Sequence, residues 1–368
     1  MTSWLEQIWY PAANEHLSPL QRLVLLLLVP LSWLFTSIAS RRRRRLTASA
    51  EASQVPTLIV GNLSVGGTGK TPLVIALIQR LKADGYRVGV ISRGYGGKPT
   101  TGEYPLDVAS HPLAAEVGDE PLLIHCATGI PVFVDPDRPR ARRELLKNHP
   151  CDLVISDDGL QHYALSRDFE LVVIDAKRGL GNGYCLPAGP LREPPSRLTE
   201  IDAVVINHGA VVGGAEPESA VALRGSAGFD GKHSWAMTLV PQPLRPLQVS
   251  APGQPAGAVQ SQPLPQPGKT LTAVAGIGNP KRFFDTLRAL GYKVIEKPFP
   301  DHHDFTVDDF SGLQGPLVMT EKDAVKCRKL LSTFDETCWV LGVTATLPDQ
   351  FYQHVVRHLL GVEAPGIR

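Results

Sequence analysis

A glycine-rich segment that ends in a lysine and a threonine is the clearest chemical feature of the sequence. Residues 64–71 read SVGGTGKT and follow a short apolar run from Leu58 to Val60. Glycines let backbone N–H groups close around phosphate oxygens, and the start of a following helix adds positive potential. In such a loop Lys70 reaches the β- and γ-phosphates of a nucleotide, and the Thr71 hydroxyl binds Mg²⁺. The segment therefore predicts a nucleotide-phosphate site.

The usual form of this motif is GxxxxGK[ST], which has glycine where this chain has Ser64. The surrounding layout is nevertheless the one the motif requires, because Leu73, Leu77 and Leu81 recur at helical spacing after the loop. A chance glycine loop is the alternative, and the order of strand, loop and helix argues against it. The predicted site consists of Ser64, Val65, Gly66, Gly67, Thr68, Gly69, Lys70 and Thr71.

Two adjacent carboxylates follow another apolar run. Leu153 to Ser156 read as a buried strand that leads into Asp157, Asp158 and Gly159. A carboxylate at the end of an apolar strand is what a Walker-B element uses to hold Mg²⁺. Asp-Asp-Gly is also a common turn. Its place about 90 residues after the phosphate loop favours the metal role.

A parallel sheet would bring these groups together. Further strand candidates lie at 88–91, 132–134, 171–174 and 203–206, with helical stretches between some of them. Such alternation predicts an α/β fold with a parallel sheet and ligands at the C-terminal ends of its strands. We therefore expect a P-loop NTPase-like core.

A segment rich in glycine, proline and small polar residues, 209–268, separates this core from a second pattern and is typical of loops or a linker. From Leu271 onward a strand, a helix and another strand predict a second, smaller α/β domain. The expected divisions are a membrane-anchor segment at 1–45, a P-loop nucleotide-binding core at 46–235, a linker at 236–270 and the smaller C-terminal domain at 271–368.

The N-terminal segment contains an uncharged apolar stretch, Leu23 to Ser40, followed by five arginines, Arg41 to Arg45. A helix of that length spans roughly 27 Å, close to the hydrocarbon thickness of a bilayer, and Pro30 would kink it. A cleaved signal peptide has its basic region before the apolar stretch, and a buried core helix is the remaining alternative. The pattern favours a membrane-anchoring helix.

The five arginines, Arg41 to Arg45, indicate which side of the membrane the protein faces. They would bind an anionic membrane surface and keep the rest of the chain in the cytoplasm. Whether the helix spans the bilayer or lies in one leaflet stays open, although Pro30 and the marginal length lean toward one leaflet.

The overall composition argues against other classes of partner. The net charge of +1 provides no field for nucleic acid, so no nucleic-acid partner is expected. The five cysteines lie scattered without CxxC spacing, which indicates reduced thiols and not a disulfide framework or a zinc site. We also predict no obligate protein partner.

The motifs resemble those of one family, the tetraacyldisaccharide 4′-kinases or lipid A 4′-kinases. Each short block is moderately specific, but their ordered set covers nearly the whole chain and is highly specific. The matching blocks are VGNLSVGGTGKTP at 60–72, ISRGYGG at 91–97, GDEP at 118–121, ISDDGLQH at 155–162, LPAGPLREP at 186–194, AGIGNPKRFF at 275–284, FPDHHDF at 299–305 and MTEKDAVKC at 319–327.

The resemblance implies a reaction and a place for it. ATP, with Mg²⁺, would phosphorylate the 4′-hydroxyl of a tetraacylated glucosamine disaccharide 1-phosphate in lipid A and lipopolysaccharide biosynthesis. The family acts at the cytoplasmic face of the inner membrane of Gram-negative bacteria. This lipid substrate and location agree with the membrane anchor inferred from composition.

The resemblance also implies catalytic residues. It places a catalytic aspartate at Asp119, although Asp119 before Glu120 and Pro121 is also a good helix cap, and Glu120 would assist with metal or water. It pairs that aspartate with His302 from the second domain. His303 is equally plausible on chemistry, and a His-His metal site has no third ligand at metal spacing.

The other motif residues receive roles of the same kind. Lys70 and Asp158 join the catalytic group, and Thr71, Asp157 and Glu120 are the expected Mg²⁺ ligands. Each substrate contact has a surface charge as its alternative, whereas Glu193 and Lys322 are motif members without a derived role. The expected substrate or phosphate contacts are Arg93, Tyr95, Arg138, Gln161, His162 and Arg192.

Rival functions lack their own signatures. A deviant-Walker partitioning ATPase has a lysine where this chain has Val65, and a P-loop GTPase has an NKxD motif whose nearest counterpart here begins at Asn207. A non-enzymatic membrane scaffold would not need Asp119 and His302 together. A membrane-associated P-loop ATPase without lipid kinase activity stays as the alternative.

Overall fold

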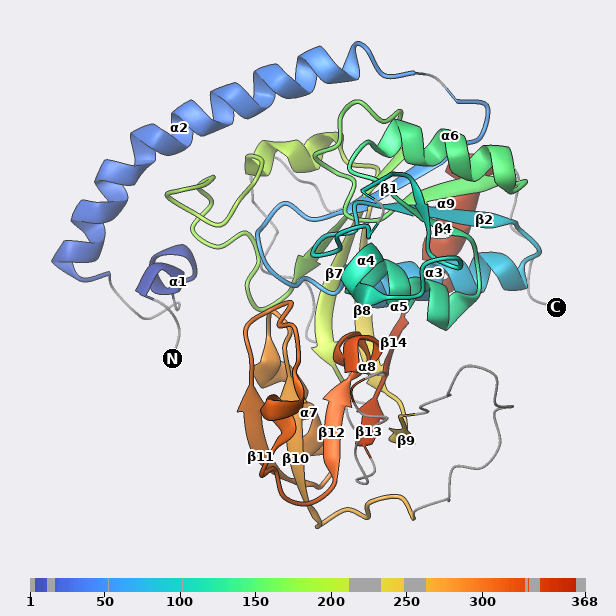
Figure 1. Ribbon diagram of the computed structural model, residues 1–368. Coiled ribbons are helices and arrows are strands. Elements are labelled where there is room, and N and C mark those ends of the chain that lie inside the picture. The colour runs from blue at the N-terminus through green and yellow to red at the C-terminus, as the bar shows by residue number, and fades with distance from the viewer. Residues whose placement is uncertain are drawn as a thin grey trace.

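The chain folds around two β-sheets, as the computed structural model shows (Figure 1). The structure describes residues 4–11, 17–51, 53–100, 102–211, 233–247, 263–327, 330 and 338–361. The larger sheet has nine strands and the smaller sheet five within those ranges. In Figure 1 the smaller sheet lies below the larger sheet, and the helix of residues 19–47 passes over the top of the larger unit.

The larger sheet has the order β14-β8-β7-β6-β1-β5-β2-β4-β3. Its strands are parallel except for the two at the edges, β3 and β14, which pair antiparallel with their neighbours. The central strands are buried throughout, as apolar strands of a parallel sheet covered on both faces are. The bounds are β1 Thr57–Gly61, β2 Val88–Ser92, β3 Leu106–Asp107, β4 Val132–Val134, β5 Leu153–Ser156, β6 Phe169–Asp175, β7 Ala203–Ala210, β8 Ser234–Pro241 and β14 Val343–Thr346.

Helices cover both faces of this sheet because successive side chains of a strand point to opposite sides. Leu58 and Val60 of β1 pack in the core formed with α3 Lys70–Ala83, α5 Asp119–Thr128 and α9 Asp349–Leu360. Ile59, between them, packs in the opposite core. That second core is formed with α6 Arg138–Asn148 and the 3₁₀ helix η1 Pro195–Glu200, while the short α4 Ala114–Val117 precedes α5.

The smaller sheet has the order β11-β10-β12-β13-β9, parallel except for β9. Helices α7 and α8 pack in separate apolar cores, so this unit is also an α/β layer structure. Its elements are β9 Arg245–Pro246, β10 Thr270–Ala275, α7 Pro280–Ala289, β11 Lys293–Pro298, η3 Val307–Phe310, β12 Leu317–Thr320, α8 Glu321–Cys327 and β13 Cys338–Leu341. The expected α/β fold class with a second, smaller unit is therefore confirmed.

The structure differs from the expected domain bounds at both ends of the smaller unit. Within the expected 271–368 domain, β14 pairs with β8 and α9 packs in the core of the larger sheet. Within the expected 236–270 linker, β8 continues to Pro241 and β9 joins the smaller sheet, while residues 248–262 lie outside the described ranges. Local periodicity identifies a strand, but long-range pairing decides which sheet it joins.

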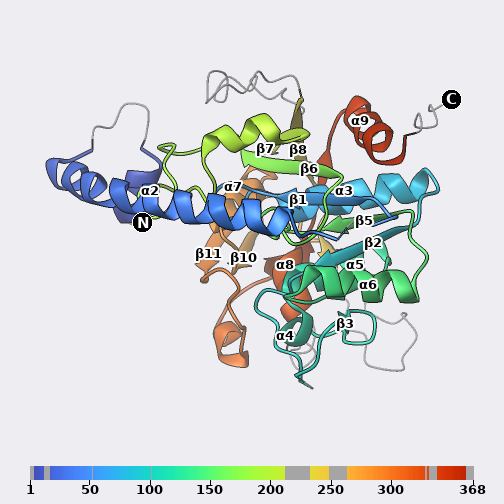
Figure 2. The same cartoon turned by 90° about the horizontal axis from the view of Figure 1, so that it is seen from above.

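The N-terminal helices are α1 Trp4–Trp9 and α2 Pro19–Thr47. By length and composition α2 could cross a membrane, and it continues through Pro30 as one helix. It contacts the body of the protein, since the buried Ser32 hydroxyl donates to the Cys185 carbonyl at 2.8 Å and Arg43 pairs with Glu200. Its other side exposes apolar side chains, among them Leu23, Leu26, Leu27, Leu31, Trp33 and Leu34. Figure 2 shows the same helix running along one face of the larger unit.

A buried ion cluster fastens η1 to the larger sheet. Arg197, only 2% exposed, pairs with Glu170 of β6 and, at 3.2 Å, with Glu193. Arg167 also pairs with Glu170 at 2.6 Å. A buried charge that loses its partner is costly, because neither water nor an opposite charge then compensates it.

We predict that Arg197→Met lowers the free energy of unfolding by about 3–5 kcal/mol, because Glu193 then lacks its cation. Urea unfolding followed by fluorescence measures this change. The matched control is Arg288→Met, which removes exposed pairs with Asp285 and Glu296 and should change the same quantity by less than about 0.5 kcal/mol. Equal losses in the two variants would contradict the role of burial.

Candidate active site

The phosphate loop is held open by two asparagines. The Asn62 side-chain amide donates to the carbonyls of Ser64 and Gly66, at 2.6 and 3.2 Å, and its oxygen accepts from Lys70 at 3.1 Å. On the other side, buried Asn207 donates to the Thr68 carbonyl at 2.9 Å. The carbonyls of Ser64, Gly66 and Thr68 are thereby paired with side-chain amides. This arrangement leaves the loop free to present backbone N–H groups to an anion.

Glycine is required at only some positions of this loop. Gly69 has φ +92°, and a Cβ there would lie 2.3 Å from the Asn207 amide nitrogen. Gly66 has φ +103°, also in the left-handed region. Ser64 has no positive φ and forms a bridge with Leu191. The departure from GxxxxGK[ST] therefore falls where the backbone does not need a glycine.

Asp157 and Asp158 follow β5 directly and have different surroundings. Asp158 lies 3.3 Å from the Lys70 ammonium and 3.6 Å from Arg192. Asp157 is buried, and neither of its carboxylate oxygens has a hydrogen-bond partner among the described residues. Burial, followed by the charges of Glu120 and Asp158, raises the pKa of Asp157 to about 7. An unpartnered buried carboxylate beside other carboxylates fits a divalent cation.

Arg138 binds the backbone that carries these two carboxylates. It is fully buried, and its guanidinium donates to the backbone carbonyls of Asp157 and Asp158 at 2.8 and 3.3 Å. Burial lowers the pKa of Arg138 to about 10, although the two carboxylates oppose the shift, and the group therefore stays charged at neutral pH. Arg138 fixes the turn that carries both carboxylates.

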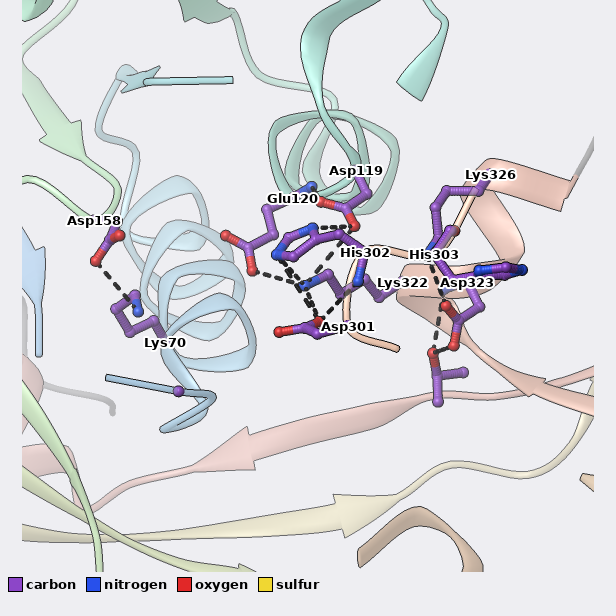
Figure 3. A network of polar contacts seen from close by, with 12 residues as sticks. Lys70, Asp119, Glu120, Asp158, Asp301, His302, His303, Lys322, Asp323 and Lys326 are labelled. Atoms are coloured by element: carbon purple, nitrogen blue, oxygen red, sulfur yellow. Dashed lines mark hydrogen bonds and ion pairs between the residues drawn. The ribbon is translucent and has the colours of Figure 1, made fainter. Parts of the chain in front are cut away.

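Asp119 and His302 meet across the two units (Figure 3). Asp119 is the first residue of α5 in the larger unit, and His302 lies in the loop after β11 of the smaller unit. The His302 Nδ1 atom is 2.9 Å from Asp119 Oδ2, whereas the other Asp119 oxygen accepts the Glu120 N–H at 2.8 Å. The N-cap of α5 is Gly118, without a side-chain cap hydrogen bond, so the geometry gives Asp119 the pairing with His302 and not the helix-cap role.

Lys322 of α8 forms ion pairs with the carboxylates around Asp119 and His302. Its ammonium lies 3.2 Å from Glu120, 3.4 Å from Asp301 and 3.8 Å from Asp119. Burial lowers the pKa of Lys322, but these three carboxylates more than offset it, so the pKa is raised and the ammonium stays charged. Lys322 therefore has the structural role that the motif alone did not reveal.

The contacts of His302 assign its proton. The Lys322 ammonium, which can only donate, is 3.3 Å from His302 Nε2. In the neutral imidazole the lone pair is therefore on Nε2 and the proton on Nδ1, facing Asp119, and the hydrogen bond with Asp119 raises the pKa of His302. Burial raises the pKa of Asp119, but the hydrogen bond from His302 and the charge of Lys322 outweigh it. The pKa is therefore lowered overall, which keeps the carboxylate ionised. An ionised carboxylate at this position can accept a proton.

His303 has different surroundings. Its Nε2 is 3.1 Å from Asp309, and its ring stacks on Phe299 with 4.7 Å between centroids. In Figure 3 it points away from Asp119. The sequence left His302 and His303 as alternatives, and the geometry brings only His302 to the carboxylate.

Two cavities share a wall at this place. One, of about 470 Å³, is lined by the phosphate loop and by the smaller unit, including His302 and Lys322. The other, of about 450 Å³, contains Asp119 and Asp157. Tyr95, Glu120, Asp158 and Arg192 line both. The Asp119–His302 contact therefore joins the two cavities.

All the expected substrate contacts line the second cavity, which contains Arg93, Tyr95, Arg138, Gln161, His162 and Arg192. Gln161 accepts from Arg192 at 3.4 Å and donates to Glu193 at 2.8 Å. Glu193, itself buried and paired with Arg197, thus holds Gln161 and Arg192 in place. This is the second role that the motifs did not reveal.

The sequence-based reasoning missed one wall of this cavity. Phe35, Ile38, Ala39 and Arg42 of α2 line it. Their spacing of three, four and seven residues from Phe35 is that of one helix face, a signal that the apolar composition of the whole segment hides. Asn62, Asn207 and Asp301 were missed as well, because a polar residue beside a motif has no distinctive spacing.

Comparison with known proteins assigns the family. The model of the LpxK family, described as tetraacyldisaccharide-1-P 4′-kinase, matches residues 24–360. The chain belongs to this family. The family resemblance inferred from the motifs is therefore confirmed, and with it the expectation of an ATP-dependent kinase.

Individual LpxK relatives extend over nearly the same length. A tetraacyldisaccharide 4′-kinase of Azotobacter vinelandii is 46% identical over 327 residues, which are 87% of this chain and 89% of the relative. One from Methylobacillus flagellatus is 44% identical over 362 residues, 97% of this chain and 96% of the relative. The solved LpxK of Aquifex aeolicus in complex with ATP is 27% identical, with a TM-score of 0.67 over 92% of this chain and 99% of that one.

The surroundings of His162 give a pH dependence. Burial, followed by the positive charges of Arg138 and Arg93, lowers the pKa of His162 to about 4. The ordinary histidine pKa is about 6.5, so below that pH the unfolded chain binds a proton that the folded chain does not. Stability contributed by neutral His162 is therefore lost as the pH falls from about 6.5 toward 4.

We predict that His162→Asn loses less stability between pH 7 and pH 5 than the wild type does. The midpoint of urea unfolding at the two pH values measures this difference. The control is His111→Asn, in the same unit but outside this cavity, which should keep the wild-type dependence. Parallel curves for wild type and His162→Asn would refute the assignment.

Proposed function

We propose that this chain transfers the γ-phosphate of ATP to the 4′-hydroxyl of a tetraacylated glucosamine disaccharide 1-phosphate, giving the bis-phosphorylated lipid A precursor. One observation carries this proposal: a cavity lined by a phosphate loop and a cavity lined by a membrane-type helix share a wall. Asp119 and His302 meet at that junction. A donor and a hydroxyl acceptor bound in the two cavities would face each other there.

The donor side follows from the phosphate loop. Backbone N–H groups of the phosphate loop and the start of α3 would bind the phosphates, except that of Val65, which donates to the Pro190 carbonyl at 2.9 Å. Lys70 would contact the β- and γ-phosphates. Thr71, Asp157 and Glu120 would hold Mg²⁺, which neutralises phosphate charge when it is bound. The unpartnered carboxylate of Asp157 supports this ligand set.

The acceptor side needs a base, because a sugar hydroxyl is a poor nucleophile. Asp119 would take the proton of the 4′-hydroxyl while the oxygen forms its bond to the γ-phosphorus and the bond between that phosphorus and the β-phosphate oxygen breaks. His302, with its proton on Nδ1, would orient Asp119 and stabilise its charge. Asp158 and Arg192, which line both cavities, would organise the transferring phosphate.

The location of the reaction follows from α2. This helix exposes apolar side chains on one side and lines the acceptor cavity on the other. We infer that it lies in the cytoplasmic leaflet of the inner membrane, with Arg41 to Arg45 near anionic headgroups. The buried contact of Ser32 with Cys185 supports a helix lying along the protein, since a spanning helix would carry that loop into the bilayer.

A direct assay tests this function. The purified protein, in detergent with Mg²⁺ and γ-labelled ATP, should transfer label to the tetraacyl disaccharide 1-phosphate. Lys70→Ala and Asp119→Ala should each lower the rate by about 100-fold or more, since they remove a phosphate contact and the base. If ATP is hydrolysed while the lipid stays unlabelled, a membrane-associated ATPase replaces the kinase as the function.

The two histidines provide a matched pair. His302→Ala should lower kcat by about 100-fold with a small change in KM for ATP, because it removes the partner of Asp119. His303→Ala should keep activity within about threefold and lower the free energy of unfolding by about 1–2 kcal/mol, because it removes a hydrogen bond and a ring stack. Steady-state kinetics and urea unfolding of both variants test this, and equal losses of kcat would exclude the assignment.

A further inference from the structure

We propose that Asp323 is a positioning residue, which holds the His302 loop so that the imidazole reaches Asp119. This inference rests on the proposed function, because it assigns a role to the support of a catalytic group. Asp323 lies in the first turn of α8, next to Lys322, and is completely buried. It lines neither cavity, so it cannot touch a substrate.

The loop that carries His302 needs support from outside. His302 has φ +60°, in the left-handed region that a residue with a side chain rarely occupies. Such a conformation persists where surrounding contacts fix it. The loop follows β11 and runs beside the end of β10, so contacts from the neighbouring elements of the sheet are what can fix it.

Asp323 supplies the first of these contacts through Gly276. The Asp323 Oδ2 atom accepts the Gly276 N–H at 3.0 Å, and the Gly276 carbonyl accepts the His302 N–H at 3.3 Å. The backbone of one residue, Gly276, just after β10, therefore connects the buried carboxylate to the backbone of His302. The Thr320 hydroxyl donates to the same Asp323 oxygen at 2.7 Å and fixes its orientation.

A second connection reaches the other side of the loop. Lys326, one turn along α8, pairs with Asp323 Oδ1 at 2.9 Å. The same ammonium donates to the His303 carbonyl at 3.1 Å. The two oxygens of Asp323 are thus linked to the residue pair that contains the catalytic histidine, one through Gly276 and one through Lys326. Figure 3 shows Asp323 and Lys326 beside His303.

The two neighbours on α8 therefore act on different parts of His302. Lys322 contacts the imidazole and the carboxylates around it. Asp323 contacts Gly276 and Lys326, which bind the backbone of His302 and His303. A fixed backbone matters because a displacement of about 1 Å at a reacting group can cost 100-fold in rate. Removing Asp323 should therefore slow phosphate transfer without weakening the phosphate loop.

A double-mutant cycle distinguishes this role from general stabilisation of the smaller unit. Single-turnover rates at saturating ATP are measured for Asp323→Asn in the wild-type background and in His302→Ala. We expect a fall of about 10- to 100-fold in the first background, with KM for ATP changed by less than about threefold, and no further fall in the second. Non-additivity of this kind shows that two residues act through one group.

Two further variants complete the design. Asp309→Asn is the control, since Asp309 in η3 contacts the imidazole of the neighbouring His303 at 3.1 Å, and it should change the rate by less than about threefold. Thr320→Val removes the two hydrogen bonds between the Thr320 hydroxyl and Asp323, one to the carboxylate and one from the Asp323 N–H, without changing the carboxylate. It should give a smaller fall in rate with the same dependence on His302. If Asp323→Asn does not fold, the rate of Thr320→Val in the two backgrounds tests the positioning role.

The outcomes separate two failures. If wild type transfers phosphate and His302→Ala does not, but Asp323→Asn and Thr320→Val are as fast as wild type or lower the rate equally in both backgrounds, the positioning role is wrong. If wild type transfers no phosphate to the lipid, or His302→Ala is as fast as wild type, the proposed function itself fails.

Discussion

The hydrogen bond between Asp119 and His302 is the contact on which the site depends, because one partner belongs to the larger unit and the other to the smaller unit. Asp119 and Glu120 lie at the start of α5 and gather negative charge beside Asp157 and Asp158. Such a group of carboxylates is stable only if cations surround it. Lys70 supplies one from the phosphate loop and Lys322 another from the smaller unit, so charge balance itself requires both units.

The topology explains how the smaller unit is held over the larger one. The chain leaves the larger sheet after β8 and returns to it as β14, and these two strands pair with each other. Both connections therefore lie at one edge of the sheet, which is the arrangement of a hinge. On the nucleotide side, Arg282 of α7 pairs with Asp175 at the end of β6 at 2.8 Å. His302 and Lys322 already contact Asp119 in this structure, so opening about that edge would carry both away from it together.

The parts of this structure that could be predicted from the sequence are those that local pattern determines. The phosphate loop, the strand before Asp157 and the second α/β unit each follow from spacing within a short segment. The sheet that β14 joins does not follow from local spacing, because β14 pairs at the sheet edge with β8, which is distant in the sequence. The choice between His302 and His303 does not either, since it depends on backbone conformation and on Asp309. The role of Asp323 does not follow from the local sequence either, because its link to His302 runs through the distant backbone of Gly276.

The helix α2 shows why composition alone gave an incomplete picture. Its apolar residues were read as one membrane-anchoring surface, yet Phe35, Ile38, Ala39 and Arg42 line the acceptor cavity while Leu27 and Leu34 face outward. A single helix thus exposes an apolar surface and forms one wall of the site. An acceptor with acyl chains and a phosphorylated sugar has the same division into apolar and charged parts. The wall formed by α2 would let the sugar reach Asp119 while the acyl chains stay along the apolar side of the helix, so the chains need not cross water.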